Sequence, residues 1–180
     1  MHRNRRGFTL IEVAMCLAIA GILIGVAVPA LQDAIARSRA AAVRSALLAS
    51  WTTAVGHAAT TGREVVLCPS TGSGCRNSFD WSEGWIAFVD IDGNRRRSPE
   101  EALVNSTDAL HDSVRLRSTT GRRRLVVQPN GGNAGSNVTF TLCDRRGIAD
   151  AVALVLANSG RLRAGTPTSK SAEGCIAALP

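Results

Sequence analysis

The apolar residues of this chain change their spacing twice, and each change predicts a different structural element. Residues 8–31 are almost all apolar, and Glu12 is the one charged residue among them. A helix over these residues would be about 36 Å long at ~1.5 Å per residue, which is enough to cross a hydrocarbon core of about 30 Å. This stretch therefore predicts a membrane-spanning helix.

The residues before this stretch decide its orientation. The segment MHRNRR holds three arginines and no acidic residue, so the positive-inside bias predicts a cytoplasmic N-terminus and export of the rest of the chain. A cleaved secretory signal peptide is the alternative. The apolar run is longer than the core of about 7–15 residues that such a peptide has, and no convincing small-x-small cleavage site precedes polar sequence. We therefore favour a span that the protein retains.

From residue 32 to about residue 61, apolar residues recur at helical spacing with arginines between them, which predicts an amphipathic continuation of the helix. Gly62 is predicted to end it. Short runs rich in Val, Ile, Leu, Thr and Phe then alternate with turn residues, as is typical of strands. The predicted strands are 64–68, 84–90, 102–105, 113–118, 124–128, 137–143 and 151–157.

These elements predict an α+β fold, in which a long N-terminal helix packs on an antiparallel β-sheet within one globular domain, residues 62–180. Turn residues predict hairpins at residues 92–94 and across residues 130–137. Aromatic residues make up only 4% of the chain and tyrosine is absent. We therefore expect a core of Val, Leu, Ile and Ala.

A resemblance to a known family rests first on residues 5–12, which read RRGFTLIE. A carboxylate in a membrane span costs about 2.5–3.5 kcal/mol and is usually paired and functional. The block resembles the processing site of type IV pilins and pseudopilins. The resemblance implies that a prepilin peptidase removes residues 1–7 by cutting between Gly7 and Phe8, and that it N-methylates Phe8. It further implies that Glu12 pairs with the new amine of a neighbouring subunit, and that residues 8–31 act as membrane anchor and then as filament core.

Later motifs look like those of minor pilins of the FimT/GspH type, which implies the pilin fold. They are GWIAFVD at 84–90 with DGN at 92–94, CDRRG at 143–147, and SGRLR at 159–163. The G-R-x-R in the last motif resembles one found in FimT-type pilins that bind DNA for natural transformation. The family also implies other minor and major pilins as partners. Its location would be the bacterial inner membrane, with a single span and a periplasmic C-terminal domain, and then a cell-surface pilus.

Four of the five cysteines lie in the exported part, where an oxidising compartment favours disulfides. Three connectivities are possible. We favour Cys68–Cys75, which closes a short local loop, and Cys143–Cys175, which clamps the C-terminal tail. A zinc site is the alternative, but the chain lacks C-x₂-C spacing and a suitably placed pair of histidines. Cys16 lies inside the span and is most simply a small apolar residue there.

Basic residues are concentrated toward the C-terminus. Residues 115–180 hold ten Lys and Arg against three Asp and Glu, whereas residues 37–114 hold eight against nine. Such a surplus on an exported domain indicates contact with a polyanion, and a merely solvated charged face is the alternative. Alternation in an extended segment would place Arg161 and Arg163 on one face, with Leu162 pointing inward. The predicted DNA-binding residues are Arg161, Arg163, Lys170, Arg145 and Arg146, with Arg122, Arg123 and Arg124 as weaker candidates.

Two other groups of residues are given structural interpretations. Arg95, Arg96 and Arg97 are expected to pair with the acidic residues around them. The sequence DIDGN at 90–94 resembles the start of a calcium loop but lacks the acidic residue at the twelfth position, so we expect a turn and no metal. His57 and His111 stand in no acid–base or nucleophile pattern, and nucleotide-binding motifs are missing, so neither enzyme activity nor a cofactor is expected.

The leading hypothesis is a minor pilin whose basic C-terminal region holds double-stranded DNA by its phosphates, without reading the sequence, and so supports DNA uptake. Its partners would be DNA, other pilins, prepilin peptidase and the inner membrane. The alternative is a structural or priming subunit of a pilus or of a type II secretion pseudopilus, with no role in DNA binding.

Overall fold

The computed structural model describes residues 7, 9–72, 74–135 and 137–180, and the chain divides into two compact units, Met1–Ile35 and Ala36–Pro180. A long helix, α1 (Leu10–Thr61), contributes to both units and continues through Pro29. By length and composition it can cross a membrane. The helix ends directly before Gly62, as predicted, and Gly62 has a φ of 68°, which suits a glycine at a helix C-terminus.

The first turn of α1 is closed by a reciprocal pair of hydrogen bonds. The Thr9 hydroxyl accepts from the backbone N–H of Glu12 at 3.3 Å, and the Glu12 carboxylate accepts from the backbone N–H of Thr9 at 3.3 Å. This arrangement is a capping box, which satisfies N–H groups that have no partner within the helix. Glu12 thus has a structural role that the sequence analysis did not predict. Phe8, the expected site of N-methylation, lies outside the described residues.

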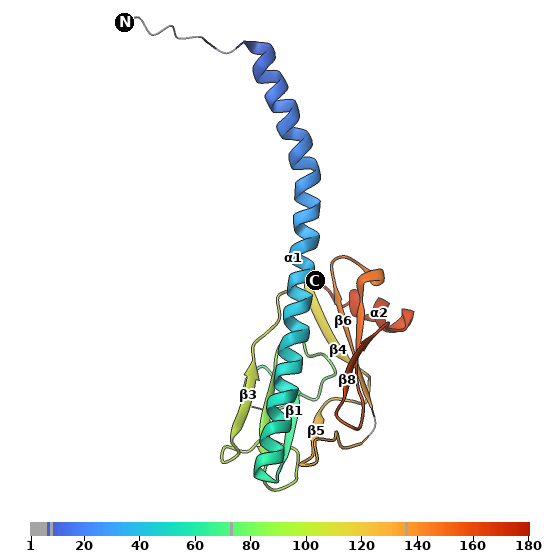
Figure 1. Cartoon of the computed structure of the whole chain (residues 1–180). Helices are drawn as coiled ribbons and strands as arrows, with labels where there is room; N and C mark the ends of the chain where they lie inside the picture. The colour runs from blue at the N-terminus through green and yellow to red at the C-terminus, as the bar shows by residue number, and fades with distance from the viewer. Residues whose placement is uncertain (1–6, 8, 73, 136) are drawn as a thin grey trace, which may run out of the picture. The chain divides into compact units, whose positions relative to one another are not determined.

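The unit Ala36–Pro180 contains two antiparallel four-stranded sheets (Figure 1). Sheet 1 has the strand order β3-β2-β1-β5, formed by β1 (Glu64–Pro69), β2 (Trp85–Asp90), β3 (Leu103–Thr107) and β5 (Leu125–Val127). Sheet 2 has the order β4-β6-β7-β8, formed by β4 (Val114–Ser118), β6 (Val138–Asp144), β7 (Val152–Leu156) and β8 (Leu162–Gly165). A short 3₁₀ helix, η1 (Ile148–Asp150), precedes β7, and the helix α2 (Ser169–Ile176) follows β8.

The core of this unit lies where the C-terminal half of α1 meets both sheets. Apolar residues of α1 recur every three or four positions, so one face of the helix is buried, as the amphipathic pattern predicted. The buried residues of this face are Val43, Leu47, Ser50, Trp51, Ala54 and Ala58. The core cluster draws all its members from residues 43–156. The fragment 36–180 therefore has a complete core of its own and is suited to experiments in solution.

Aromatic side chains are few, but the largest of them fill the centre of the core. Trp81, Trp85 and Phe140 are almost completely buried, and Trp81 packs edge-on against Phe140 with ring centroids 5.1 Å apart. Trp85 Nε1 donates to the buried Ser50 hydroxyl of α1 at 3.0 Å. The expectation of a purely aliphatic core is therefore wrong.

All seven predicted strands are present within one or two residues of their expected bounds. The predicted fold, a long helix packed on antiparallel β-sheet, is confirmed, and the strands divide between two sheets. Strands β5 and β6 belong to different sheets, so these two strands do not pair as the predicted hairpin. The chain does reverse there, because Val127 pairs with Asn133 in an antiparallel bridge and the Gln128 N–H donates to Gly132 O at 2.8 Å. Strands β2 and β3 do pair, through a longer connection than the predicted tight turn. Strand β8 and helix α2 were not predicted, and the expected polar tail is in part helical.

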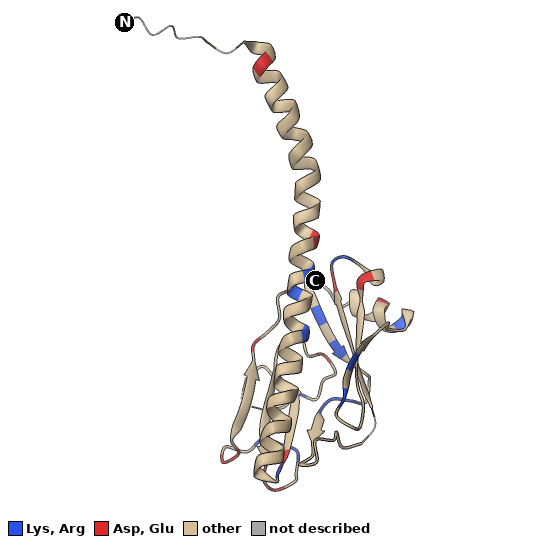
Figure 2. Ribbon diagram, viewed as in Figure 1, with Lys and Arg blue, Asp and Glu red and all other residues tan. Residues whose placement is uncertain are grey.

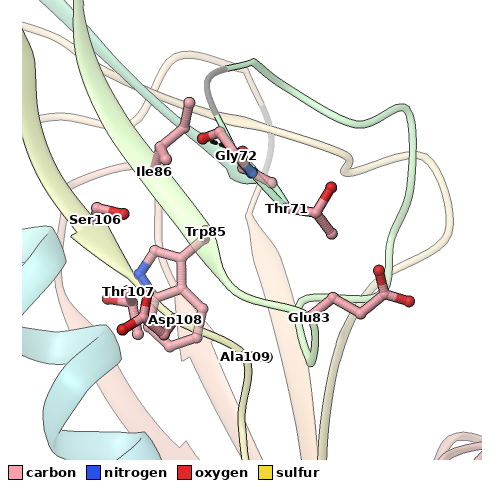
Figure 3. Close-up of a pocket in the computed structure, with 10 residues that line it drawn as sticks. Thr71, Gly72, Glu83, Trp85, Ile86, Ser106, Thr107, Asp108 and Ala109 are labelled. Atoms are coloured by element: carbon pink, nitrogen blue, oxygen red, sulfur yellow. Dashed lines mark hydrogen bonds between the residues drawn. The ribbon is translucent and has the colours of Figure 1, made fainter.

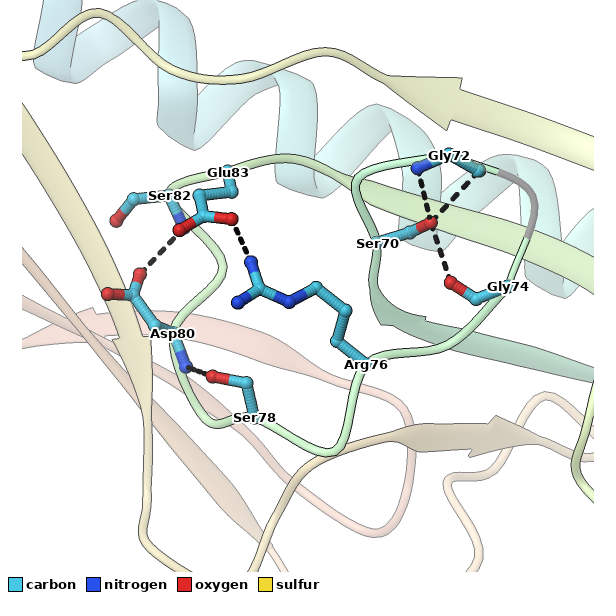
Figure 4. Close-up of polar contacts among 8 residues, drawn as sticks. All are labelled: Ser70, Gly72, Gly74, Arg76, Ser78, Asp80, Ser82 and Glu83. Atoms are coloured by element: carbon cyan, nitrogen blue, oxygen red, sulfur yellow. Dashed lines mark hydrogen bonds and ion pairs between the residues drawn. The ribbon is translucent and has the colours of Figure 1, made fainter.

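Both disulfides have the pairing that we favoured, Cys68–Cys75 and Cys143–Cys175. Within the loop closed by the first disulfide, the Ser70 hydroxyl donates to the carbonyls of Gly72 and Gly74 (Figure 4). The same figure shows the ion pair between Arg76 and Glu83, which joins this loop to the residues before β2. The second disulfide joins β6 to α2.

Candidate nucleic-acid interface

The outer face of sheet 2 is the face that points away from the core. Alternate residues of β6 point into the core, so Thr139 and Thr141 lie on the outer face. The register places Arg117 opposite Thr141 and Arg163 opposite Val155. Since residues opposite one another in an antiparallel pair share a face, both arginines belong to the outer face.

Helix α2 covers part of this outer face, over β4 and β6. Besides the disulfide, two arginines of β4 bind carbonyl groups of α2 and of the residues just after it. Arg115 Nε donates to Ala178 O at 3.0 Å, and the Arg117 guanidinium donates to Gly174 O. Bonds from a charged donor are stronger than neutral ones, so α2 is well fixed. Lys170, in the first turn of α2, is exposed at the edge of this contact.

A groove of about 440 Å³ runs between α2 and the end of β4. Two cations and six hydroxyl-bearing side chains line it, and none of its described lining residues carries a carboxylate. The hydroxyls belong to Ser118, Thr119, Thr120, Thr139, Thr141 and Ser171, and the cations are Arg117 and Lys170. Hydroxyl and cationic donors are the groups that proteins use to contact phosphate oxygens. Ser118 and Thr119 already donate to the carbonyls of Arg122 and Thr139, so it is the other four hydroxyls and the two cations that give the groove the chemistry of an anion-binding surface.

Arg161 and Arg163 lie at the edge strand β8. Leu162 pairs with Leu156 on the core side and Arg163 with Val155 on the outer side, so the predicted alternation holds for these two residues. Arg163 lies two strands away from Thr139, about 10 Å at ~4.8 Å per strand. Arg161 directly precedes β8 and is exposed. It also borders a cavity of about 420 Å³ beside α1.

The turn that presents Arg161 is held from several sides. Trp51 Nε1 of α1 donates to Gly160 O at 3.0 Å, and the Ala157 N–H donates to Arg161 O at 3.0 Å. Gly160 has a φ of 81°, and a Cβ there would lie 2.2 Å from Gly131 O. The first glycine of the G-R-x-R motif is therefore required by the backbone, because a side chain at that position fits neither the conformation nor the space.

Arg145 and Arg146 do not join this group. They follow β6 at the end remote from Thr139, about 20 Å along the strand at ~3.3 Å per residue. Arg146 is bound to Asp144 at 2.7 Å and to Asp150 at 2.9 Å, and its side chain is only 13% exposed. The structure thus splits the predicted five-residue site, and Arg146 serves the turn after β6. Arg145 is exposed.

Arg122, Arg123 and Arg124 lie in the loop that leads from β4 in sheet 2 to β5 in sheet 1. They line another cavity, of about 340 Å³, together with Arg95 from the loop between β2 and β3. Arg95 and Arg96 form no ion pair among the residues that the structure describes, so the expected local pairing is not found for these two. Figure 2 shows Lys and Arg on β4, β8, α2 and the adjoining loops.

A cavity of the opposite character lies on sheet 1. It has a volume of about 390 Å³, and its lining includes Glu83, Asp108 and the hydroxyls of Thr71 and Thr107 (Figure 3). Carboxylates at this surface repel phosphate, so this cavity is unsuited to an anion.

The carboxylates of Asp90, Asp92 and Glu101 lie within 4.8 Å of one another in the loop between β2 and β3. Each accepts from a backbone N–H of that loop: Asp90 from Arg95 at 3.1 Å, Asp92 from Asn94 at 3.0 Å, and Glu101 from Ile91 at 2.8 Å. Burial raises the pKa of the Asp90 carboxyl, and the nearby Glu101 and Asp92 add to this. These hydrogen bonds order the connection from β2 to β3, which is longer than the turn that the sequence predicted at residues 90–94.

The sequence analysis missed Arg115, Arg117 and the threonines of the groove. The alternation V-R-L-R-S over residues 114–118 does place both arginines on the face opposite the apolar residues. This alternation could therefore have identified the two arginines from the sequence. The groove was not visible in the sequence, because its hydroxyls come from β4 and the loop after it, from β6 and from α2, which meet only in the fold.

A long N-terminal helix joined to a domain of antiparallel sheets defines the pilin class of fold, and comparisons with known proteins agree. The model of the family described as type II transport protein GspH matches residues 44–160, and that of the prokaryotic N-terminal methylation motif matches residues 2–28. The pilin-like protein PilA1 of Thermus thermophilus is 32% identical over 171 residues, which cover 89% of this chain and 98% of that protein. The chain therefore belongs to the GspH family of type IV minor pilins and type II secretion pseudopilins.

The fold is also similar to that of the type IV minor pilin FimU of Pseudomonas aeruginosa. In its P21 crystal form the TM-score is 0.54 at 17% identity, over 77% of this chain and 92% of FimU. In the P65 form the TM-score is 0.52 at 19% identity, over 74% and 94%. Pilins and pseudopilins are structural subunits and not enzymes, as the sequence predicted. Their family implies association with other pilins in a filament, and the apolar helix with its prepilin motif indicates membrane anchoring before assembly.

Proposed function

We propose that this minor pilin binds the phosphate backbone of extracellular double-stranded DNA and so supports DNA uptake in natural transformation. The binding surface is the hydroxyl-lined groove of sheet 2, which includes Lys170, together with Arg163 and Arg161. The observation that carries the proposal is the composition of the groove. Cations and hydroxyl donors line it, and carboxylates are missing from its described lining.

The buried aromatic residues support contact with phosphates over contact with bases. Proteins that grip single strands stack bases on exposed aromatic rings. Here Trp51, Trp81 and Trp85 are each at most 5% exposed, and Phe79 in the groove lies under the Arg117 guanidinium at 4.8 Å. A surface of cations and hydroxyls whose ring, Phe79, is half-buried and lies against a guanidinium suits the regular backbone of a duplex and reads no sequence.

The assembly steps belong to the same proposal. Prepilin peptidase cuts between Gly7 and Phe8, the new Phe8 amine is methylated, and Glu12 pairs with the amine of a neighbouring subunit. The domain beyond the membrane span is then periplasmic before it reaches the pilus. Mass spectrometry of the protein purified from membranes tests the first step. A mature chain that begins at N-methylated Phe8 is expected, and an intact chain or cleavage elsewhere would contradict it.

DNA binding is tested on the fragment 36–180 by fluorescence anisotropy with a labelled duplex of about 24 base pairs at several salt concentrations. Affinity is expected to fall steeply with salt, by about 0.9 log units per log unit of salt for each phosphate neutralised. The double variant Arg161→Gln/Arg163→Gln is expected to bind about tenfold more weakly to every sequence, with a salt slope lower by about two. Arg37→Gln/Arg44→Gln, which removes two exposed arginines of α1, is the control with the same loss of charge. No binding at low salt, or equal binding by both variants, would refute the proposal.

A structural role for the same arginines has a specific basis. Strand β8 lies at the edge of sheet 2, and charged residues on an edge strand prevent pairing with other chains. A charge of either sign protects the edge strand from pairing, whereas binding to phosphate requires a positive charge. Arg161→Glu/Arg163→Glu is therefore expected to remain monomeric and to lose DNA binding, and Arg161→Lys/Arg163→Lys is expected to keep most of both properties. If the glutamate variant binds DNA as the wild type does, edge protection alone explains these residues.

A further inference from the structure

We propose that the cavity lined by Arg95, Arg122, Arg123 and Arg124 is a second phosphate-binding site, adjacent to the groove of sheet 2. The phosphate backbone of one DNA duplex would then bind first in the groove of sheet 2 and next in this cavity beside sheet 1. The inference rests on the proposed DNA binding and extends it to a separate set of residues. It assigns a function to Arg95, for which the sequence predicted only local pairing with acidic residues.

The two cavities share one loop. Thr119 and Thr120 line the groove of sheet 2, and the next residues of the chain, Gly121 to Arg124, line the second cavity. The loop turns sharply there, because the Arg122 N–H donates to Thr119 O at 2.8 Å and Gly121 has a φ of 113°. The segment before Trp81 also borders both cavities, with Phe79 at the groove and Asn77 at the second cavity. A polyanion that occupies the groove therefore meets the second cavity next.

Arg95 reaches this site from a distant part of the chain. Its backbone N–H donates to the Asp90 carboxylate at 3.1 Å, and its carbonyl accepts from the Arg124 guanidinium at 2.7 Å. Its φ of 59° lies in the left-handed region, which is uncommon for a residue with a side chain. Two hydrogen bonds thus fix the backbone in a conformation that places Arg95 in the lining of the cavity.

The side chains keep donors available for a ligand. Arg123 donates one N–H to Asn77 Oδ1 at 2.8 Å, and Arg124 donates one to Arg95 O. A guanidinium has five N–H donors, so each retains others for a bidentate contact with phosphate. The described lining holds four arginines and no carboxylate. Like charges so close together repel one another, and a bound anion relieves that repulsion.

The test compares variants of the fragment 36–180 in the same salt series with the same duplex. Arg95→Gln/Arg123→Gln removes two arginines from different segments of the cavity. Arg63→Gln/Arg96→Gln is the matched control, since it removes two exposed arginines outside the cavity lining, one of them next to Arg95. The cavity variant is expected to bind at least tenfold more weakly at about 100 mM salt, with a salt slope lower by about two. The control is expected to change affinity less than about threefold and to keep the slope. Thermal unfolding checks that both variants are folded.

The outcomes separate this inference from the proposal on which it rests. If the wild type binds no DNA even at low salt, the proposed function fails. If the wild type binds and Arg161→Gln/Arg163→Gln weakens binding, but the cavity variant behaves like its control, the second site alone is refuted. If the cavity variant and Arg161→Gln/Arg163→Gln each lower the salt slope and their effects add in the quadruple variant, the two sites contact separate phosphates of one duplex.

Discussion

The Cys143–Cys175 disulfide is expected to stabilise the domain more than the Cys68–Cys75 disulfide, because it closes a longer loop. Its cysteines are 32 residues apart, and the loop-entropy relation gives about 3.7 kcal/mol for that length. The shorter loop spans 7 residues and corresponds to about 2.3 kcal/mol. For a domain of about 145 residues, ~1 kcal/mol shifts the melting temperature by about 3 °C, so the expected losses are about 11 °C and about 7 °C.

The experiment compares Cys143→Ala/Cys175→Ala with Cys68→Ala/Cys75→Ala in the fragment 36–180, each of which removes one disulfide. Thermal and urea unfolding are followed by tryptophan fluorescence, because the three tryptophans are buried in the core and report its exposure. Hydrogen exchange adds a local measurement. Arg117 still binds Gly174 O of α2, and Arg115 binds Ala178 O just after the helix, so amides of Ser169–Ile176 are expected to lose protection in the first variant without complete detachment.

The reasoning is refuted if the first variant loses no more stability than the second. That result would show that the contacts of α2 with β4 and β6, and not the closure of the loop, determine how firmly α2 is held. The DNA affinity of the same variants gives an independent readout. Loosening α2 moves Lys170 and Ser171 at the groove, so the first variant is expected to bind DNA more weakly and the second to bind as the wild type does.

The remaining predictions concern single side chains. Asp90→Asn is expected to raise the free energy of unfolding at pH 7. Burial raises the pKa of Asp90, so its protonated form stabilises the fold at low pH, and this stability is lost as the pH rises through the folded-state pKa. The neutral asparagine does not lose it. Urea unfolding between about pH 3 and pH 8 measures it, and an advantage of the variant that persists unchanged at the lowest pH would contradict it. Gly160→Ala is expected to lower the free energy of unfolding by at least about 1–2 kcal/mol from the left-handed backbone alone, and by more because of the contact with Gly131 O. Gly165→Ala, with nothing near its Cβ position, is the control in the same thermal melts. Arg146→Gln is expected to lower the free energy of unfolding by about 3–5 kcal/mol, because it leaves the buried Asp144 carboxylate without its cation. The salt slope of DNA binding is expected to stay unchanged. A lower slope would show that Arg146 belongs to the DNA-binding site.

The local elements of the fold could be predicted because their signals lie within single stretches of sequence. The buried face of α1 follows from apolar residues at helical spacing, and β4 from the alternation over residues 114–118. Strand β8 escaped prediction because L-R-A-G is short and contains only one large apolar residue. Helix α2 escaped because S-K-S-A-E-G-C-I is polar and contains a glycine, although Thr168 is a suitable N-cap and its side chain does accept from the Ser171 N–H.

The division into two sheets could not be predicted, since it depends on pairings between distant segments. Strand β5 is buried along all three residues and pairs with β1, whereas the alternating β6 pairs with β4 and β7. The sequence of neither strand determines which other strand it pairs with. The same limit applies to the site. Arg163 was predicted from its motif, but the groove and the position of Arg95 follow from contacts between segments that the sequence leaves far apart.

The way in which the fold uses its acidic residues explains why the basic surplus forms a surface. Among residues 115–180 the acids are Asp144, Asp150 and Glu173, and the first two are both bound to Arg146. Arg115 and Arg117 donate to carbonyls, which orients them without cancelling their charge. The other cations of the C-terminal third lie mainly on β4, β8, α2 and the loop to sheet 1, with the exposed Glu173 of α2 among them, while Glu83 and Asp108 line a different cavity. This separation of charge is the electrostatic basis of the proposed DNA binding, even though residues 37–114 are close to neutral.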